Sequence, residues 1–217
     1  MQKNITIYLS IPAEYKEIDA NEDTRFRFKC TDECRKNPRC CGNPLLTPED
    51  LSKLARHFNL SNEEFFHEYC KLFYFRAKET EPAWYDVILK RGESGYCILL
   101  DTKNPIKSCS VHEDCQPYVC GTFPVLFKKE DKYGITMCPG VDKGDLYTVG
   151  QWVKENKTIE YRNRLRRIAK KQMKPFKDDF QRLLKLIKRK EKKKVKKLTH
   201  EIKMRQREII MEMFGIK

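Results

Sequence analysis

The sequence has no stretch that approaches the ~20 consecutive apolar residues needed to span a bilayer, which argues against a membrane-spanning helix. The apolar run from Ile5 to Ile11 is too short for a secretory signal peptide, and Glu14 and Lys16 follow it closely. We therefore expect a cytoplasmic protein that has no membrane partner.

Internal repeats and glycine-rich binding loops are also missing. No segment recurs at the period of a solenoid or a propeller. No glycine-rich loop follows a predicted strand in the way that an S-adenosylmethionine site would require. The sequence therefore offers no direct sign of a bound nucleotide cofactor.

Acidic residues are scarce in the last third of the chain. Residues 151–217 hold 24 Lys and Arg against 8 Asp and Glu, whereas residues 1–150 are close to neutral, so this third carries all of the net charge of +14. Apolar residues recur there at steps of three and four, and between Phe180 and Ile209 they suggest one long helix that lies on a partner surface or pairs as a coiled coil. We predict a domain over 1–150 and a basic α-helical extension over 151–217.

The densest basic run, Lys188 to Lys197, is typical of proteins that contact nucleic acid or another polyanion. Aromatic residues are too sparse in the extension to stack on bases, so such binding would be directed at the phosphate backbone. The alternative is a solvated helix with no partner.

Residues 1–150 show a mixture of strand and helix signals. Thr47 and Ser61 each begin a capping motif, which predicts two helices, the second of which reaches Phe73. Alternating apolar residues predict strands over 4–11, 25–29, 84–89 and 96–100, and a hairpin formed by 123–128 and 132–137. We expect an α+β fold, with cysteines in loops and at strand ends.

Cysteine is abundant, with ten residues in the chain. A cytosolic protein keeps its thiols reduced, so metal binding is the favoured use of a cysteine cluster. The Lys- and Glu-rich composition hints at a thermophile, in which intracellular disulfides do occur, and disulfides stay as the alternative.

The first four cysteines, Cys30, Cys34, Cys40 and Cys41, form the pattern C-x3-C-x5-C-C. Converging thiolates repel one another unless a cation lies between them, and thiolate is a preferred ligand of zinc and iron. Cysteines further along the chain offer more ligands. Eight candidates indicate two metals, one cluster with spare thiols, or one site together with a few buried cysteines.

These residues resemble the YkgJ-type cysteine-cluster family, whose domains are described as zinc- or iron-chelating. The matching segments occur in the family's order within residues 25–140: Phe28 to Cys41, Thr47 to Asp50, Cys97 to Leu99, Cys109, Pro117 to Pro124, and Cys138. The spacing of the early cysteines is looser than in the family. His112 and Gln116 replace the family's usual tyrosine and arginine, and the interval from Cys109 to Cys120 is one residue longer.

The resemblance implies a metal site that binds zinc or iron, the latter also as a 4Fe-4S cluster. Its ligands would be Cys30, Cys34, Cys40, Cys41, Cys97, Cys109, Cys120 and Cys138. A relative, the flagellin lysine N-methylase FliB, shares the cysteine domain, which makes methyl transfer to a protein substrate an alternative activity. We interpret Cys70 as a core residue and His112 as a polar loop residue; Cys115 is an extra ligand, a redox thiol or a surface residue.

Three function classes stay open at this stage. We expect first a metal-binding protein of unassigned biochemical role. The alternatives are a protein-lysine N-methylase-like enzyme, an adaptor that contacts RNA or the ribosome through the basic extension, and a protein that stores or delivers metal. A catalytic residue cannot be named from the sequence.

Overall fold

The computed structural model describes residues 16–38, 40–75, 83–112, 115–129 and 132–217. The chain forms a mixed α and β structure with two compact units, and each unit is built from two separate stretches of sequence. Unit 1 comprises residues 1–46 and 89–163, and unit 2 comprises 47–88 and 164–217. The two-domain division that we expect at residue 150 stays a prediction.

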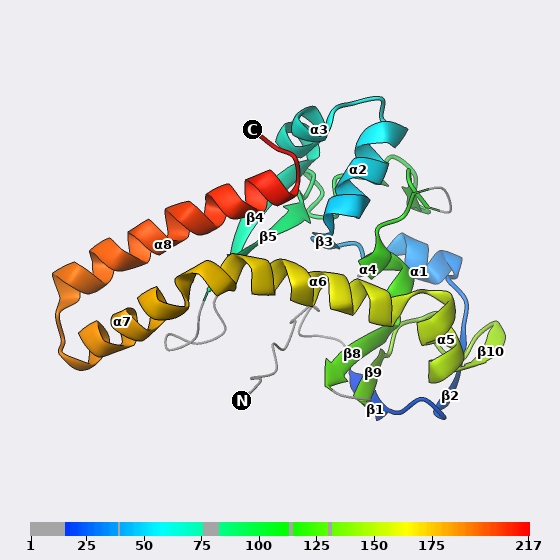
Figure 1. The fold of residues 1–217 in the computed structure, drawn as a ribbon. Coiled ribbons are helices and arrows are strands. Elements are labelled where there is room, and N and C mark those ends of the chain that lie inside the picture. Colours follow the sequence, from blue (N-terminus) through cyan, green and yellow to red (C-terminus); the bar gives the residue numbers. More distant parts are fainter. Residues whose placement is uncertain (1–15, 39, 76–82, 113–114, 130–131) are drawn as a thin grey trace. The chain divides into compact units, whose positions relative to one another are not determined.

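The first unit contains most of the strands (Figure 1). Its sheet has the order β1-β9-β8, with all neighbours antiparallel, and a second pair joins β10 to β2. The elements of this unit are β1 Glu17–Ala20, β2 Arg25–Phe28, α1 Asp32–Lys36, β3 Leu45–Leu46, β6 Leu100–Asp101, β7 Ser108–Cys109, α4 Tyr118–Thr122, β8 Val125–Lys129, β9 Lys132–Thr136, β10 Asp145–Thr148 and α5 Val149–Glu155.

The core of the first unit is aromatic and β-branched. Its buried members come from β2, β8, β9 and α5, together with Val141 from the segment before β10. Trp152 lies at the edge of this core, with its ring centroid 5.3 Å from that of Phe28, and its indole N–H donates to the Thr122 carbonyl at 2.9 Å. Cys138 packs against the same cluster. The core therefore borders the segment of Cys138 and, through Phe28, the segment of Cys30.

The second unit contains most of the helical residues, and α6 Thr158–Met173 crosses the boundary between the units at residue 163. Its other elements are α2 Pro48–His57, α3 Asn62–Tyr69, β4 Cys70–Phe75, β5 Trp84–Leu89, the 3-10 helix η1 Lys174–Phe176, α7 Lys177–Lys188 and α8 Lys192–Met213. The strands β4 and β5 are neighbours in one sheet.

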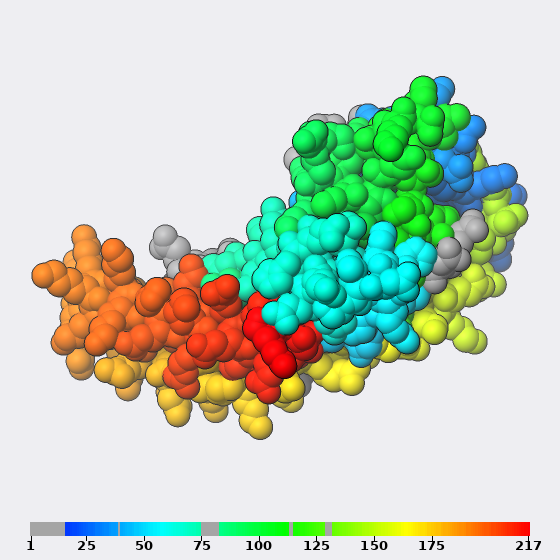
Figure 2. Space-filling view, turned by 90° about the horizontal axis from the view of Figure 1, so that it is seen from above, coloured from blue at the N-terminus to red at the C-terminus, as the bar shows by residue number. Residues whose placement is uncertain are grey.

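Two buried glutamines hold the C-terminal helices against β5 and the residue before it. Gln172 of α6 exchanges two hydrogen bonds with the backbone of Tyr85, at 2.7 and 2.9 Å, and Gln206 of α8 donates to the Ala83 carbonyl at 2.7 Å. At the end of the chain, the Asn62 side chain donates to the carbonyl of Phe214 at 3.1 Å. Figure 2 shows the red C-terminal residues against the cyan α2–α3 region.

The helical structure predicted for residues 151–217 is confirmed, but the prediction of one long helix between Phe180 and Ile209 is wrong. The chain turns between α7 and α8, where Lys190 has a φ of 57°, and the two helices lie side by side (Figure 1). Their contact buries Leu183 of α7 against Leu198 and Ile202 of α8, and Phe176 of η1 belongs to the same cluster. The three- and four-residue spacing therefore marks the inner faces of a helical hairpin.

Two predictions at cysteine-bearing segments also need correction. The second helix ends at Tyr69 rather than continuing to Phe73, because β4 begins at Cys70. The predicted strand over 96–100 is mostly a turn that follows Gly95, whose φ of 79° reverses the chain. The two capped helices, the 84–89 strand and the hairpin over 125–136 are confirmed. The strand predicted over 4–11 lies outside the described residues.

Among the helices that the structure describes, none has the length and apolar character required to cross a membrane.

Candidate metal centre

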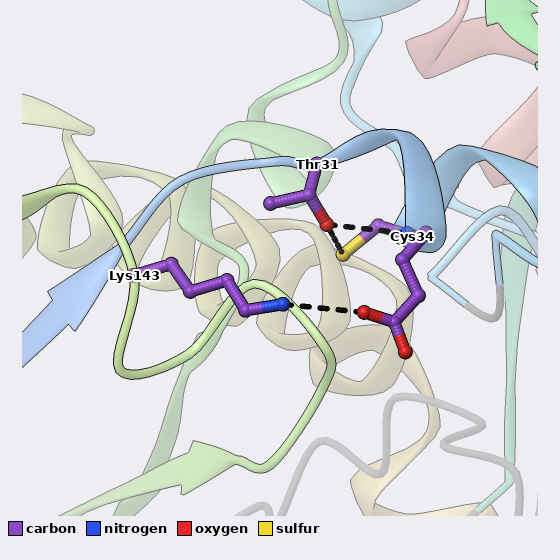
Figure 3. A network of polar contacts seen from close by, with 4 residues as sticks. Thr31, Cys34 and Lys143 are labelled. Carbon is purple, nitrogen blue, oxygen red and sulfur yellow. Dashed lines mark hydrogen bonds and ion pairs between the residues drawn. The ribbon is translucent and has the colours of Figure 1, made fainter.

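Thr31 lies between the first two cysteines and begins helix α1. Its hydroxyl oxygen accepts a hydrogen bond from the Cys34 backbone N–H at 3.4 Å, and its O–H donates to Cys34 Sγ at 3.5 Å (Figure 3). Lys143 lies near the same helix because it pairs with Glu33 at 3.2 Å (Figure 3). One threonine therefore caps the helix and orients a thiol.

The loops of Cys30 and Cys138 run side by side. The backbone N–H of Lys29 donates to the Gly140 carbonyl at 3.1 Å. A Cβ atom at Gly140 would lie 2.5 Å from the Lys29 carbonyl oxygen, so the close approach of the two backbones requires glycine here. Two cysteines that are 108 residues apart in the sequence are in this way carried by adjacent loops.

Cys40 and Cys41 lie in a turn that the Cys41 N–H closes by donating to the Pro38 carbonyl at 3.0 Å. Their Sγ atoms are 4.0 Å apart. Cys40 is exposed and Cys41 is half-buried. The adjacent thiols therefore differ in their access to solvent.

The remaining predicted ligands come from three further segments. The Cys97 N–H donates to the Cys41 carbonyl at 3.0 Å, so these two segments are directly joined. In the β6–β7 pair, Leu100 lies opposite Cys109. Cys120 lies in the short helix α4. All eight predicted ligands belong to unit 1.

Burial and neighbouring thiolates raise the pKa of most of these thiols. Burial comes first for Cys30, whose pKa is raised further by the charges of Cys34 and Cys40. Burial also raises the pKa of Cys138 to about 11, and the charges of Cys34 and Cys40 make smaller contributions in the same direction. Cys34 and Cys40 are therefore close enough to Cys30 and Cys138 to act on them electrostatically.

The other thiols are linked in the same manner. Burial raises the pKa of Cys97 to about 11, with a smaller contribution from the charge of Cys109. The pKa of Cys41 is raised because it shares a hydrogen bond with Cys40, because it is buried, and because Cys120 and Cys97 are nearby. The same hydrogen bond lowers the pKa of Cys40. The charge of Cys40 in turn raises the pKa of Cys109, after the larger effect of burial.

All ten cysteines lie among the described residues, and all are free thiols, so the disulfide alternative is not the arrangement in this structure. Within the described part of the chain, no three His, Cys, Asp or Glu side chains converge at the geometry of metal ligands. The eight thiols are gathered without forming a complete ligand shell. As donors, soft thiolate sulfurs fit zinc or iron better than magnesium or calcium.

The three residues whose roles the sequence left open have clear positions. Cys70 is buried, with 2% of its surface exposed, and belongs to unit 2, which agrees with its interpretation as a core residue. Cys115 is also buried, so the surface alternative for it is wrong. His112 is exposed, and its backbone N–H donates to the Cys109 carbonyl at 3.2 Å.

Two residues that support the thiols were missed at the level of sequence. Thr31 donates to the sulfur of Cys34, and the Arg35 side chain counteracts the rise in the pKa of Cys30. The signal for Thr31 was present, since threonine before Asp32 and Glu33 is a common helix start. Arg35 had no signal beyond its position next to a cysteine.

Comparison of the chain with known protein families, with curated proteins and with solved structures finds no match. The resemblance to the YkgJ-type family therefore stays a prediction, carried by the cysteine motifs alone.

Proposed function

We propose that this chain binds zinc or iron through the eight cysteines of unit 1: Cys30, Cys34, Cys40, Cys41, Cys97, Cys109, Cys120 and Cys138. The observation that carries the proposal is that separate loops and short elements bring these eight thiols into one electrostatically linked group. The packing of the fold does not by itself require thiols from so many separate loops to lie close together.

Charge provides the physical argument for a cation. The pKa values of about 11 at Cys97 and Cys138 indicate that buried thiolates are costly when nothing neutralises them. A divalent metal ion removes this cost, because it deprotonates the thiols that it binds. The segments around the thiols are also short of regular structure, and β3, β6 and β7 have two residues each. Metal binding would stabilise such loops.

The test is to purify the chain without oxygen and to measure zinc, iron and acid-labile sulfide together with the absorption spectrum. Zinc without colour supports a thiolate zinc site, and iron with sulfide and absorption near about 400 nm supports an iron–sulfur cluster. Substitution of Cys30, Cys41 or Cys120 by serine should lower the metal content, whereas Cys70→Ala in unit 2 should leave it unchanged. Absence of both metals would refute the proposal.

We propose RNA binding as a second function, which a specific surface favours. The tip of the α7–α8 hairpin, residues 185–197, carries nine exposed Lys and Arg side chains and a single acidic residue, Glu191. Glu191 pairs with Lys194 at 2.6 Å, so it offsets one of the nine positive charges. A concentrated positive charge of this kind attracts the phosphate backbone of a nucleic acid.

The salt dependence of binding to a single-stranded RNA tests this second function. Lys193→Gln combined with Lys196→Gln should weaken binding and reduce the slope of log K against log salt by about 1.4, since each phosphate contact on a single strand contributes about 0.7. The matched control, Lys132→Gln with Lys154→Gln, removes two exposed lysines from unit 1 and should leave the slope unchanged. Equal effects of both pairs would contradict a specific role for the hairpin tip, as would binding only to anionic lipid vesicles.

A further inference from the structure

Helix α6 and the 3-10 helix that follows it contain a long stretch without acidic residues. Residues 161–177 hold eight Lys and Arg and no Asp or Glu. Two of these cations have partners within the fold. The Arg162 guanidinium lies 3.9 Å from the centroid of the Phe127 ring, and Arg164 pairs with Glu49 at 2.8 Å. These two contacts leave most of the positive charge of the stretch unexplained.

Five of the other cations lie on one exposed side of α6 and η1. The buried side consists of Leu165, Ile168, Ala169, Gln172 and Phe176. Residues three and four positions apart share one side of a helix, and the side away from the buried residues is basic. Its exposed cations, which we call the α6 face, are Arg167, Lys170, Lys171, Lys174 and Lys177. All of them belong to unit 2.

The α6 face places like charges where helical side chains are neighbours. Arg167 lies three and four residues before Lys170 and Lys171, and Lys174 lies four and three residues after them. Like charges at these spacings destabilise a helix. In the part of the chain that the structure describes, none of the five cations forms an ion pair. The helix dipole favours lysines in the last turn of α6, but it accounts for Lys170 and Lys171 only.

Helix α8 shows how a solvated helix in the same unit balances its charge. It is also rich in lysine, but Glu201, Glu208 and Glu212 lie along it, and Lys197 pairs with Glu201 at 3.9 Å. Charges of both signs are typical of a helix that faces solvent. The absence of acidic residues from the α6 face therefore favours an anionic partner over solvent alone.

The surroundings of these cations indicate the form of that partner. No Phe, Tyr or Trp side chain is exposed on α6, η1, α7 or α8, since Tyr161 and Phe176 are buried and Phe180 packs against the hairpin core. Proteins that bind single strands stack the bases on aromatic side chains. A double helix keeps its bases stacked internally and presents the phosphates of two strands, which long cationic side chains can reach.

We infer that the α6 face is a second phosphate-binding surface of unit 2, in addition to the tip of the α7–α8 hairpin, and that the ligand is base-paired RNA. This inference rests on the proposed RNA-binding function. The five cations contact phosphate oxygens and read no base edges, so binding is insensitive to sequence. The phosphates also offset the repulsion among the neighbouring cations of the helix.

The salt dependence of binding to an RNA duplex, and to one of its strands alone, tests the inference. The wild-type chain should bind the duplex more tightly than the strand. Lys170→Gln combined with Lys174→Gln should reduce the slope of log K against log salt for the duplex by about 1.8, since each phosphate contact on a double helix contributes about 0.9. Lys193→Gln with Lys196→Gln should have a similar effect, and the control Lys132→Gln with Lys154→Gln should have none.

Lysine footprinting provides a second measurement, on the wild-type chain. An amine-acetylating reagent is applied with and without the RNA duplex, and the modified lysines are identified by mass spectrometry. Bound duplex should protect Lys170 and Lys174 from acetylation, whereas Lys132 and Lys154 should react equally in both samples.

The outcomes separate the inference from the function on which it rests. If only the hairpin-tip variant lowers the slope, or if the duplex leaves Lys170 and Lys174 reactive, the α6 face is not a binding surface, and RNA binding by the tip stands. Binding of the single strand as tight as that of the duplex would overturn the choice of base-paired RNA. Binding of neither RNA by the wild-type chain would overturn the RNA-binding function itself.

Discussion

The Sγ atoms of Cys40 and Cys41 lie 4.0 Å apart, in a turn that the Cys41 N–H closes by donating to the Pro38 carbonyl. The pair shares a hydrogen bond, which lowers the pKa of Cys40 and raises that of Cys41. The proposed metal function depends on this pair, because the charge of Cys40 acts on Cys30, Cys109 and Cys138, and the charges of Cys97 and Cys120 act on Cys41.

The two tryptophans report on different units, since Trp152 lies in unit 1 and Trp84 in unit 2. Removal of metal from a Trp84→Phe variant should change the emission of Trp152, because Trp152 packs against Phe28, two residues before Cys30. In Trp152→Phe, chelation should leave the emission of Trp84 nearly unchanged. Fluorescence spectra before and after chelation check this, and an equal response of both tryptophans would argue against a centre confined to unit 1.

Gly140→Ala should destabilise the chain by about 1–3 kcal/mol, because the new methyl group would overlap the Lys29 carbonyl and separate the loops of Cys30 and Cys138. Metal content should also fall. The matched control is Gly92→Ala, where the nearest atom would be 3.9 Å away. Urea unfolding and metal analysis of the two variants provide the comparison. Equal stability and equal metal content in both variants would contradict a role for the contact between the loops of Cys30 and Cys138.

Thr31→Val should cost about 1 kcal/mol of stability through loss of the helix cap. It also removes the hydroxyl that donates to Cys34 Sγ, and such supporting contacts typically change metal affinity by about 10–100-fold. Thr31→Ser keeps both interactions and should resemble the wild type. Competition with a chromophoric chelator measures the metal affinity. A Thr31→Ser variant that binds metal as weakly as Thr31→Val would contradict this role for the hydroxyl.

Asp86→Asn should stabilise unit 2 relative to the wild type more at pH 8 than at pH 5. Burial raises the pKa of Asp86 to about 7 from a value of 3.8, despite the hydrogen bond from the Trp84 indole. The folded carboxyl therefore holds a proton that the unfolded state releases above pH 3.8, so the stability that this proton provides is lost as pH rises from 3.8 to about 7 and changes little above that. Asparagine can still accept the indole hydrogen bond.

Urea unfolding followed by Trp84 emission in a Trp152→Phe background measures this pH effect. The difference between Asn and Asp should grow from pH 5 to pH 8. A difference that is constant over this range would show that the carboxyl does not titrate between these values.

Local signals in the sequence predicted local structure well. Thr47 and Ser61 cap α2 and α3 through the capping boxes that their sequences suggest, because each box depends on residues only three positions apart. The hairpin of β8 and β9 follows equally from two adjacent alternating segments. These elements need no information from distant residues.

Contacts between residues that are distant in the sequence could not be predicted from such local signals. The close approach of Gly140 to Lys29 and the bond from Gln206 to Ala83 join segments more than 100 residues apart. The turn at Lys190, which has a positive φ without being glycine, interrupts a spacing that is otherwise continuous. The eight candidate ligands could be chosen from the sequence, but their grouping depends on backbone contacts that only a structure provides.

X-ray absorption at the edge of the bound metal tests the central claim most directly, because it identifies the ligand atoms without any substitution. For zinc, the account predicts a first shell of four sulfur atoms at about 2.3 Å and no nitrogen or oxygen ligand. A first shell dominated by nitrogen or oxygen at about 2.0–2.1 Å, or a chain that retains no metal to measure, would contradict it.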